Sequence, residues 1–133
     1  MPAPTQLAAS LYVAAGGGVG AVLRYQTGRL ITQMAGPGSA FPWPTLTVNV
    51  VGSVLMGVLA GWLARYGQGG EQWRLLLGVG ALGGFTTFSS FSLEMMLLIE
   101  RGQTGIAIAY VAASVAAGLA GLWLGLVAMR TFA

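Results

Sequence analysis

The 133-residue chain contains no cysteine, histidine, aspartate or lysine, and only 7% of its residues are charged. The lack of cysteine excludes disulfides, and the lack of both cysteine and histidine excludes the zinc sites and nucleophilic arrangements built on these residues. All six basic residues are arginines, and three glutamates are the only acidic residues. The arginines are spread along the chain and form no basic stripe for nucleic acid. These absences argue against an enzyme and against a nucleic-acid partner.

Hydrophobic residues make up 56% of the chain, and the mean hydropathy is +0.77. A soluble domain carries about 25% charged residues, so this composition indicates an integral membrane protein in contact with lipid. The opening MPAPTQLAAS has no basic region of the kind that begins a cleaved signal peptide. We therefore expect the first hydrophobic segment to be kept as a span.

Crossing a membrane as a helix takes about 20 predominantly apolar residues, and several segments of the chain meet this requirement. They run from about Leu7 to Met34, Thr45 to Tyr66, Trp73 to Ile99 and Thr104 to Met129. Proline and glycine are concentrated in the first two connections, where they cannot continue a helix. The sequence predicts an all-α membrane protein with four transmembrane helices, one domain over residues 1–133, and both termini on the same side.

Arginine is divided almost evenly between the two predicted sides. Arg65, Arg74 and Arg130 flank one side, and Arg29 and Arg101 flank the other. The Lys/Arg difference between sides sets orientation, so we expect insertion in both orientations unless features other than charge select one. Glycines four residues apart recur in every segment, and such pairs let membrane helices pack closely. Because four short helices leave little room for an aqueous pathway within one subunit, we expect a homodimer.

The third segment is interrupted by GGFTTFSSFSLE, residues 83–94. Gly83 and Gly84 weaken a helix, and the hydroxyls of Thr86 and Thr87 offer partners to freed backbone groups. We predict that the third helix is broken over Gly83–Thr87 and resumes near Phe88. A broken membrane helix presents carbonyls from its first half, which suit a cation, and N–H groups from its second half, which suit an anion.

Five other polar side chains lie within the segments, and each has a structural and a functional interpretation. Arg24 either faces a partner or water-filled cavity, or lies near an interface. Asn49 either joins two helices or replaces water around an anion. Glu94, the only carboxylate predicted to lie inside a span, serves either packing or transport. Tyr110 and Ser114 share one helix face and either bond to their own helix or face a pathway.

Phenylalanine recurs every third residue at Phe85, Phe88 and Phe91, so that Phe88 and Phe91 share a helix face. A phenylalanine stripe usually serves packing. The edge of an aromatic ring nevertheless carries positive quadrupole charge and can approach an anion. Next to a helix break, hydroxyls and an intramembrane Asn49, the stripe favours an anion pathway.

These motifs resemble the fluoride channel family called Fluc or CrcB. The resemblance is carried by GGFTTFSSFS at residues 83–92, NVVGS at 49–53 and GGVGAVLRY at 17–25, and the order and spacing match over all four spans. The resemblance implies an antiparallel, dual-topology homodimer of four-helix subunits in the bacterial inner membrane. It also implies passive, selective conduction of fluoride that exports the ion and lowers its toxicity, without an organic cofactor.

The resemblance further assigns roles by motif position. Phe88 and Phe91 would line two pores with their edges toward fluoride, and Asn49 would be the polar contact on the ion path. Main-chain carbonyls of Gly83 and Thr86 in each subunit would hold a structural sodium ion (Na⁺) at the dimer centre. The other implied pathway residues are Arg24 beside a pore entrance, Thr87, Ser90, Tyr110, Ser114 and Glu94.

Two positions depart from the family pattern, and two other functions compete with it. Ser90 stands where the family commonly has threonine, and Gly118 stands one turn beyond Ser114, where some relatives carry a hydroxyl. A small dual-topology antiporter for cationic drugs or guanidinium typically depends on a carboxylate in the first helix, which this chain lacks. A membrane assembly factor would explain the glycine spacings but would leave TTFSSF without a purpose.

Overall fold

The computed structural model describes residues 2–67 and 69–132, and every regular element in this part of the chain is helical. The three long helices are α1 (Gln6–Ala35), α2 (Trp43–Tyr66) and α6 (Thr104–Phe132). Between α2 and α6 lies a series of shorter helices: α3 (Glu71–Trp73), η1 (Arg74–Leu82), α4 (Gly83–Phe85) and α5 (Phe88–Glu100). The three helices and the series are each long and apolar enough to cross a membrane. The prediction of an all-helical protein with four potential spans is therefore confirmed.

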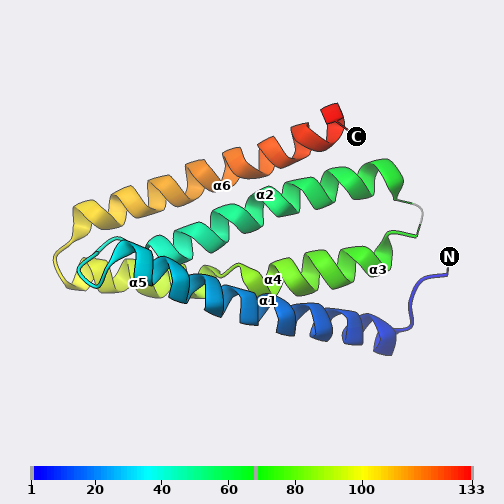
Figure 1. Ribbon diagram of the computed structural model, residues 1–133, viewed down its shortest axis with the longest axis horizontal. Helices are drawn as coiled ribbons and strands as arrows, with labels where there is room; N and C mark the ends of the chain where they lie inside the picture. The colour runs from blue at the N-terminus through cyan, green and yellow to red at the C-terminus, as the bar shows by residue number, and fades with distance from the viewer. Residues whose placement is uncertain (1, 68, 133) are drawn as a thin grey trace.

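The spans run alternately up and down and lie side by side (Figure 1). One end of the bundle, here called the terminal end, carries both chain termini and the connection between α2 and α3. The opposite end, here called the loop end, carries the α1–α2 and α5–α6 connections. Helix α2 packs mainly on α6, and α1 packs mainly on η1 and α4. Helix α2 also contacts η1, so the third span packs against both α1 and α2.

Local sequence signals account for where the helices begin and end. The Thr5 hydroxyl accepts a hydrogen bond from the Ala8 N–H at 3.2 Å and caps the start of α1. Gly36 ends α1 in the left-handed region, at φ 84°, where glycine is strongly favoured. Pro44 lies in the first turn of α2, where its missing N–H costs no helical bond. Gly102, at φ 75°, permits the tight turn between α5 and α6.

The third span differs in detail from its predicted form. Gly83 and Gly84, which we expected to lie in the break, are helical, and only Thr86 and Thr87 have extended backbone. The reason for glycine at position 84 is packing, because a methyl group there would lie 2.5 Å from the Gly17 carbonyl oxygen of α1. Helix η1 is wound as a wide π-helix, which we did not predict from the sequence.

Glycines also set the distances between the other helices. A methyl group on Gly16 or Gly80 would collide with the backbone of the opposite helix in the α1–η1 pair. The same holds for Gly57 and Gly125 in the α2–α6 pair. In a membrane, where helices gain little from burying apolar side chains, such close approach supplies much of the packing energy.

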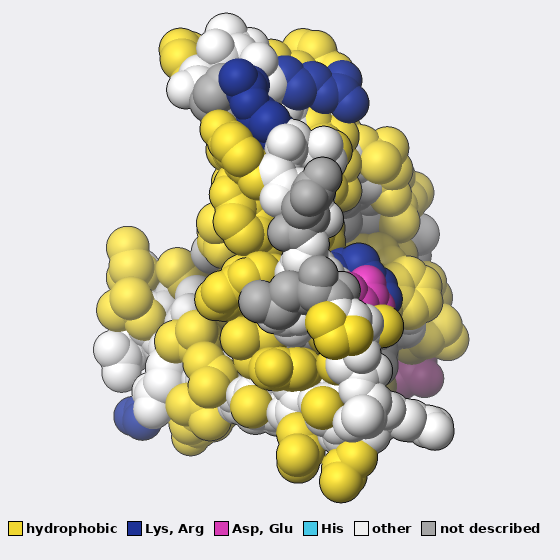
Figure 2. Space-filling view, turned by 90° about the vertical axis from the view of Figure 1, so that its right-hand side faces the viewer, with side chains coloured by type: hydrophobic (Ala, Val, Ile, Leu, Met, Phe, Trp, Pro, Cys, Tyr) yellow, Lys and Arg dark blue, Asp and Glu magenta, His cyan; other side chains and the backbone are white. Residues whose placement is uncertain are grey.

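The outside of the bundle is largely hydrophobic. Figure 2 looks onto the terminal end, where arginine side chains lie among hydrophobic ones. Large apolar side chains are exposed along the spans, among them Phe88, Ile108 and Leu119. The arginines in the last turns of α2 and α6 lie at the terminal end, as does the Arg74–Glu71 ion pair at 2.8 Å. Charge at the ends and apolar residues between them are what a membrane-spanning bundle requires.

Candidate functional site

The site lies midway along the third span, where helix α4 stops and α5 begins. Thr86 (φ −89°, ψ 158°) and Thr87 (φ −151°, ψ 119°) are both extended, and we call this pair the extended segment. The Thr86 N–H and hydroxyl both donate to the Leu82 carbonyl, at 3.0 and 2.9 Å. The Thr87 hydroxyl accepts from the Ser90 N–H at 3.1 Å and caps α5. The threonines therefore finish one helix and start the next within the membrane.

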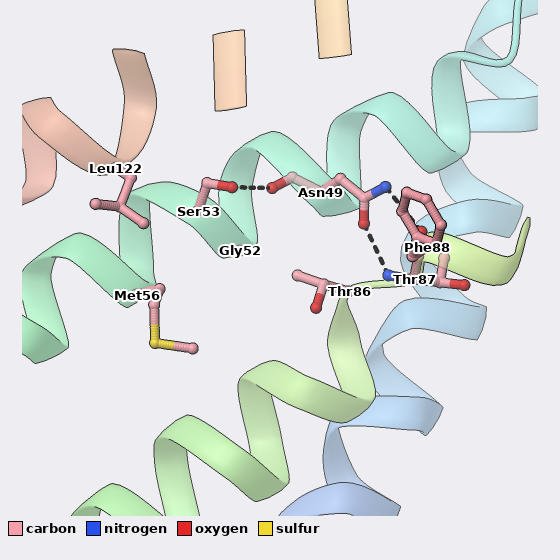
Figure 3. A pocket seen from close by; sticks show the side chains of 8 residues that line it. All are labelled: Asn49, Gly52, Ser53, Met56, Thr86, Thr87, Phe88 and Leu122. Carbon is pink, nitrogen blue, oxygen red and sulfur yellow. Dashed lines mark hydrogen bonds between the residues drawn. The ribbon is translucent and has the colours of Figure 1, made fainter. Parts of the chain in front are cut away.

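Asn49 of α2 bonds to both backbone groups of Thr87 (Figure 3). Its Nδ2 donates to the Thr87 carbonyl at 3.0 Å, and its Oδ1 accepts from the Thr87 N–H at 2.8 Å. In a continuous α-helix that N–H would instead donate to the Gly83 carbonyl, four residues earlier. The Gly83 carbonyl therefore lacks its usual helical donor.

A polar pocket of about 310 Å³ adjoins the extended segment. Figure 3 shows its lining from α2, the extended segment, α5 and α6. The lining residues are Asn49, Gly52, Ser53, Met56, Thr86, Thr87, Phe88 and Leu122. Its polar side chains are half-buried, whereas the Phe88 side chain is 79% exposed in the single chain. Four polar side chains and an aromatic ring thus border one pocket midway along the spans.

Arg24 approaches the same segment from α1. Its Nε donates to the Gly84 carbonyl at 3.1 Å, so the positive guanidinium lies at the carbonyl end of α4. Arg24 also lines two cavities: one of about 570 Å³ with Arg29 and Glu94, and a smaller one of about 80 Å³ with Thr87 and Ser90. The structure therefore places Arg24 against another helix and beside a cavity at once.

A row of aromatic rings runs from the extended segment toward Glu94. The ring centroids of Phe88 and Phe91 lie 5.7 Å apart, and those of Phe91 and Tyr110 lie 5.0 Å apart with edge-on geometry. Tyr110 is fully buried, and its hydroxyl donates to Glu94 Oε2 at 2.7 Å. The Thr45 hydroxyl donates to the other carboxyl oxygen, Oε1, at 2.6 Å. Glu94 is thus held between α2 and α6 by two hydroxyls.

Most of the predicted site residues lie around the extended segment or in this row of rings. Ser114 lies one turn beyond Tyr110, and its hydroxyl is buried without a hydrogen-bond partner in the described part of the chain. We did not predict roles for Thr45, Gly52 and Ser53 from the sequence. All three lie on α2 near Asn49, and their spacing of three or four residues was a signal that they share its face.

Four potential spans with polar residues midway along them define a small multi-pass membrane protein. The sequence profile of the family described as "CrcB-like protein, Camphor Resistance (CrcB)" matches residues 11–126. This chain belongs to that family.

Close relatives cover nearly the whole chain. A protein of Novosphingobium aromaticivorans named "Fluoride-specific ion channel FluC" is 64% identical over 124 residues, which are 93% of this chain and 98% of the relative. Proteins with the same name from Erythrobacter litoralis and Rhodospirillum centenum are 54% and 56% identical. These two alignments cover 96% and 91% of this chain, and 96% and 94% of the respective relatives. The resemblance predicted from the motifs is therefore confirmed.

Proposed function

We propose that this chain forms a passive channel selective for fluoride, which exports the ion across the bacterial inner membrane and so lowers its toxicity in the cytoplasm. The observation that carries this proposal is the near full-length similarity to relatives named as fluoride-specific ion channels. The geometry supports it, because polar groups and phenylalanine rings meet at mid-span around the extended segment.

The proposed pathway replaces the water around fluoride with weak but numerous contacts. The hydroxyls of Thr87 and Ser90 and the second N–H of the Asn49 amide supply donors, and the ring edges of Phe88 and Phe91 supply positive electrostatic potential. None of these groups carries a full charge, so the ion is admitted without being held too tightly. Further residues proposed to line the pathway are Arg24 near its entrance, Tyr110, Ser114 and Glu94.

The exposure of the site supports an antiparallel homodimer with two pores. In hydrocarbon, half-exposed polar groups such as those of Asn49 and Thr87 are costly unless something covers them. A second copy of the chain would cover the pocket and the Phe88 ring, which is 79% exposed in one chain. The nearly even arginine distribution between the terminal end and the loop end supports insertion in both orientations.

The freed carbonyl of Gly83 supports a structural sodium ion at the dimer centre. Gly83 is exposed in the single chain, and its carbonyl has lost its usual donor because the Thr87 N–H bonds to Asn49. Carbonyl oxygens are hard ligands, which suit such a cation. Gly83 and Thr86 of each subunit would hold it, and the ion would supply charge that joins the two extended segments.

Fluoride efflux from liposomes tests the proposed function. We expect liposomes that contain the purified protein and a potassium ionophore to release loaded fluoride rapidly and to retain loaded chloride, as followed with ion-selective electrodes. Protein-free liposomes provide the control. Equal release of both ions would indicate a broader anion pore, and no release from an intact dimer would contradict the channel. Proton-coupled movement of a cation would instead favour an antiporter.

Sodium replacement tests the central cation separately. When all sodium is exchanged for N-methylglucamine, which is too large for a cage of carbonyls, we expect slower fluoride efflux and a less stable dimer. Restored sodium should restore both. An unchanged rate after exhaustive exchange would show that the extended segments need no small cation.

A further inference from the structure

The two residues of the extended segment rest on one face of α2. Thr87 has dihedral angles close to those of an antiparallel β-strand. It exchanges two hydrogen bonds with Asn49, at 2.8 and 3.0 Å, as paired residues on neighbouring strands do. The primary amide of Asn49 carries a donor and an acceptor in one plane, like a peptide group. The Asn49 side chain of α2 thus offers Thr87 the same donor and acceptor that a residue of an adjacent strand would offer.

This pairing fixes the orientation of the Asn49 amide. The Thr87 N–H can only donate, so Oδ1 must face it, and the Thr87 carbonyl can only accept, so Nδ2 must face that group. One Nδ2 hydrogen is used in this way and one is left. Aspartate keeps the acceptor but lacks the donor when ionised, and the single hydroxyl of serine cannot reproduce both atoms. The two bonds therefore account for asparagine at this position.

Gly52 provides the space for the other residue of the segment. It lies three residues after Asn49 on the same face of α2 and is buried. A methyl group on Gly52 would collide with the Thr86 side-chain methyl and would lie 3.6 Å from the Phe85 ring. Asn49 therefore binds Thr87, while Gly52 leaves room for Thr86.

We propose that Asn49 and Gly52 are positioning residues. They hold the extended segment against α2, an arrangement here called the seat, and so fix the place of Phe88, the next residue in the chain. This inference rests on the proposed function and deepens it. The Asn49 amide then bonds chiefly to the protein backbone, and its bond to the Thr87 carbonyl fixes the direction of the remaining N–H. Disturbing the seat displaces the start of α5 and with it the ring that borders the pocket.

An amide-to-ester replacement at Thr87 tests the seat without altering the Asn49 side chain. Incorporating the α-hydroxy analogue of threonine removes the N–H that donates to Oδ1 and leaves every side chain unchanged. It also makes the Thr86 carbonyl, a proposed sodium ligand, a weaker ester acceptor, so the sodium dependence of efflux is measured beside the rate and should match that of the unmodified protein. We expect at least a tenfold lower rate of fluoride efflux from liposomes, with the dimer retained. The matched control is the same replacement at Leu93, which lies within α5 with an exposed side chain, and it should leave the rate near that of the unmodified protein. An unchanged rate at Thr87 would overturn the inference.

Two variants of Asn49 test the inference even if the ester-containing protein does not form a dimer. Asn49→Asp keeps an acceptor for the Thr87 N–H, whereas Asn49→Leu keeps none, and both remove the side-chain N–H groups. We expect the Thr87 amide to stay protected from hydrogen exchange in Asn49→Asp and to exchange at least tenfold faster in Asn49→Leu. Equal protection would refute the seat. This measurement needs no fluoride flux, so it is separate from a failure of the proposed function, which would appear as no efflux from the unmodified protein.

Gly52 can be tested with a matched glycine substitution. Gly52→Ala should lower fluoride efflux at least tenfold, because the added methyl displaces Thr86. Gly105→Ala is the control, since nothing lies within 4 Å of the position of its new methyl group. Equal efflux from the two variants would show that Gly52 does not help to seat the segment.

Discussion

Replacing both Phe88 and Phe91 with isoleucine is expected to lower fluoride efflux about a hundredfold while leaving the dimer assembled. An edge-on contact between two aromatic rings is worth about 0.5–1.5 kcal/mol. We expect a ring edge on the ion to contribute the upper end of this range, and a loss of about 1.4 kcal/mol slows passage about tenfold. Isoleucine is apolar and keeps much of the bulk, but it has no ring quadrupole. The measurement is the initial rate of fluoride loss from liposomes, with assembly followed by size-exclusion chromatography.

The control for this double substitution is Phe132→Ile, at the C-terminal end of α6, where the side chain is 88% exposed. It removes a ring of the same kind far from the extended segment and should leave efflux unchanged. Because Phe91 also packs edge-on against the buried Tyr110, each single variant should be measured for assembly as well. Full efflux from an assembled double variant would exclude ring edges as the source of ion stabilisation.

The four potential spans could be predicted because each depends only on local composition. A run of apolar residues is long enough to cross a membrane or is not, whatever it packs against. The proline and glycine connections follow from local backbone restrictions in the same way. Neither the length of an apolar run nor the backbone restrictions of proline and glycine depend on which helices are in contact.

The contacts of the site could not be predicted, because they join residues far apart in the chain. The bonds from Asn49 to Thr87 span 38 positions, and the bond from Thr45 to Glu94 spans 49. An asparagine inside a predicted span needs hydrogen-bond partners, but its position in the sequence does not indicate that both partners are backbone atoms of one residue. The chemistry was predictable, whereas the pairing was set by how α2 lies against the third span.

Glycines inside a span likewise have two interpretations that the sequence alone does not distinguish. A glycine pair inside a span indicates either a weak point in the helix or a place where another backbone comes close. At Gly84 the second meaning holds, since α1 approaches there at Gly17. Arg24 likewise had two interpretations, and its bond to the Gly84 carbonyl joins it to the helix end next to the extended segment.

A second prediction concerns the orientation of the subunits in the membrane, because the proposed dimer needs one subunit in each orientation. A variant with Arg101→Gln and Gln6→Arg gains charge at the terminal end and loses it at the loop end. A second variant with Arg130→Gln, Gly38→Arg and Gly105→Arg does the reverse, and its two new arginines replace glycines with open space around them. The side richer in Lys/Arg stays in the cytoplasm, so each variant should insert in a single, opposite orientation.

Cells that lack their own means of fluoride export provide the measurement, as growth in the presence of fluoride. Either variant alone should fail to protect them, because it supplies only one of the two orientations that an antiparallel dimer requires. Co-expression of the two should restore growth, since one subunit of each kind rebuilds the dimer. Protein levels should be matched, so that a loss reflects orientation and not expression. Protection by either variant alone, with its single orientation verified, would mean that parallel subunits or one subunit can conduct, and the nearly even arginine distribution would then need another explanation.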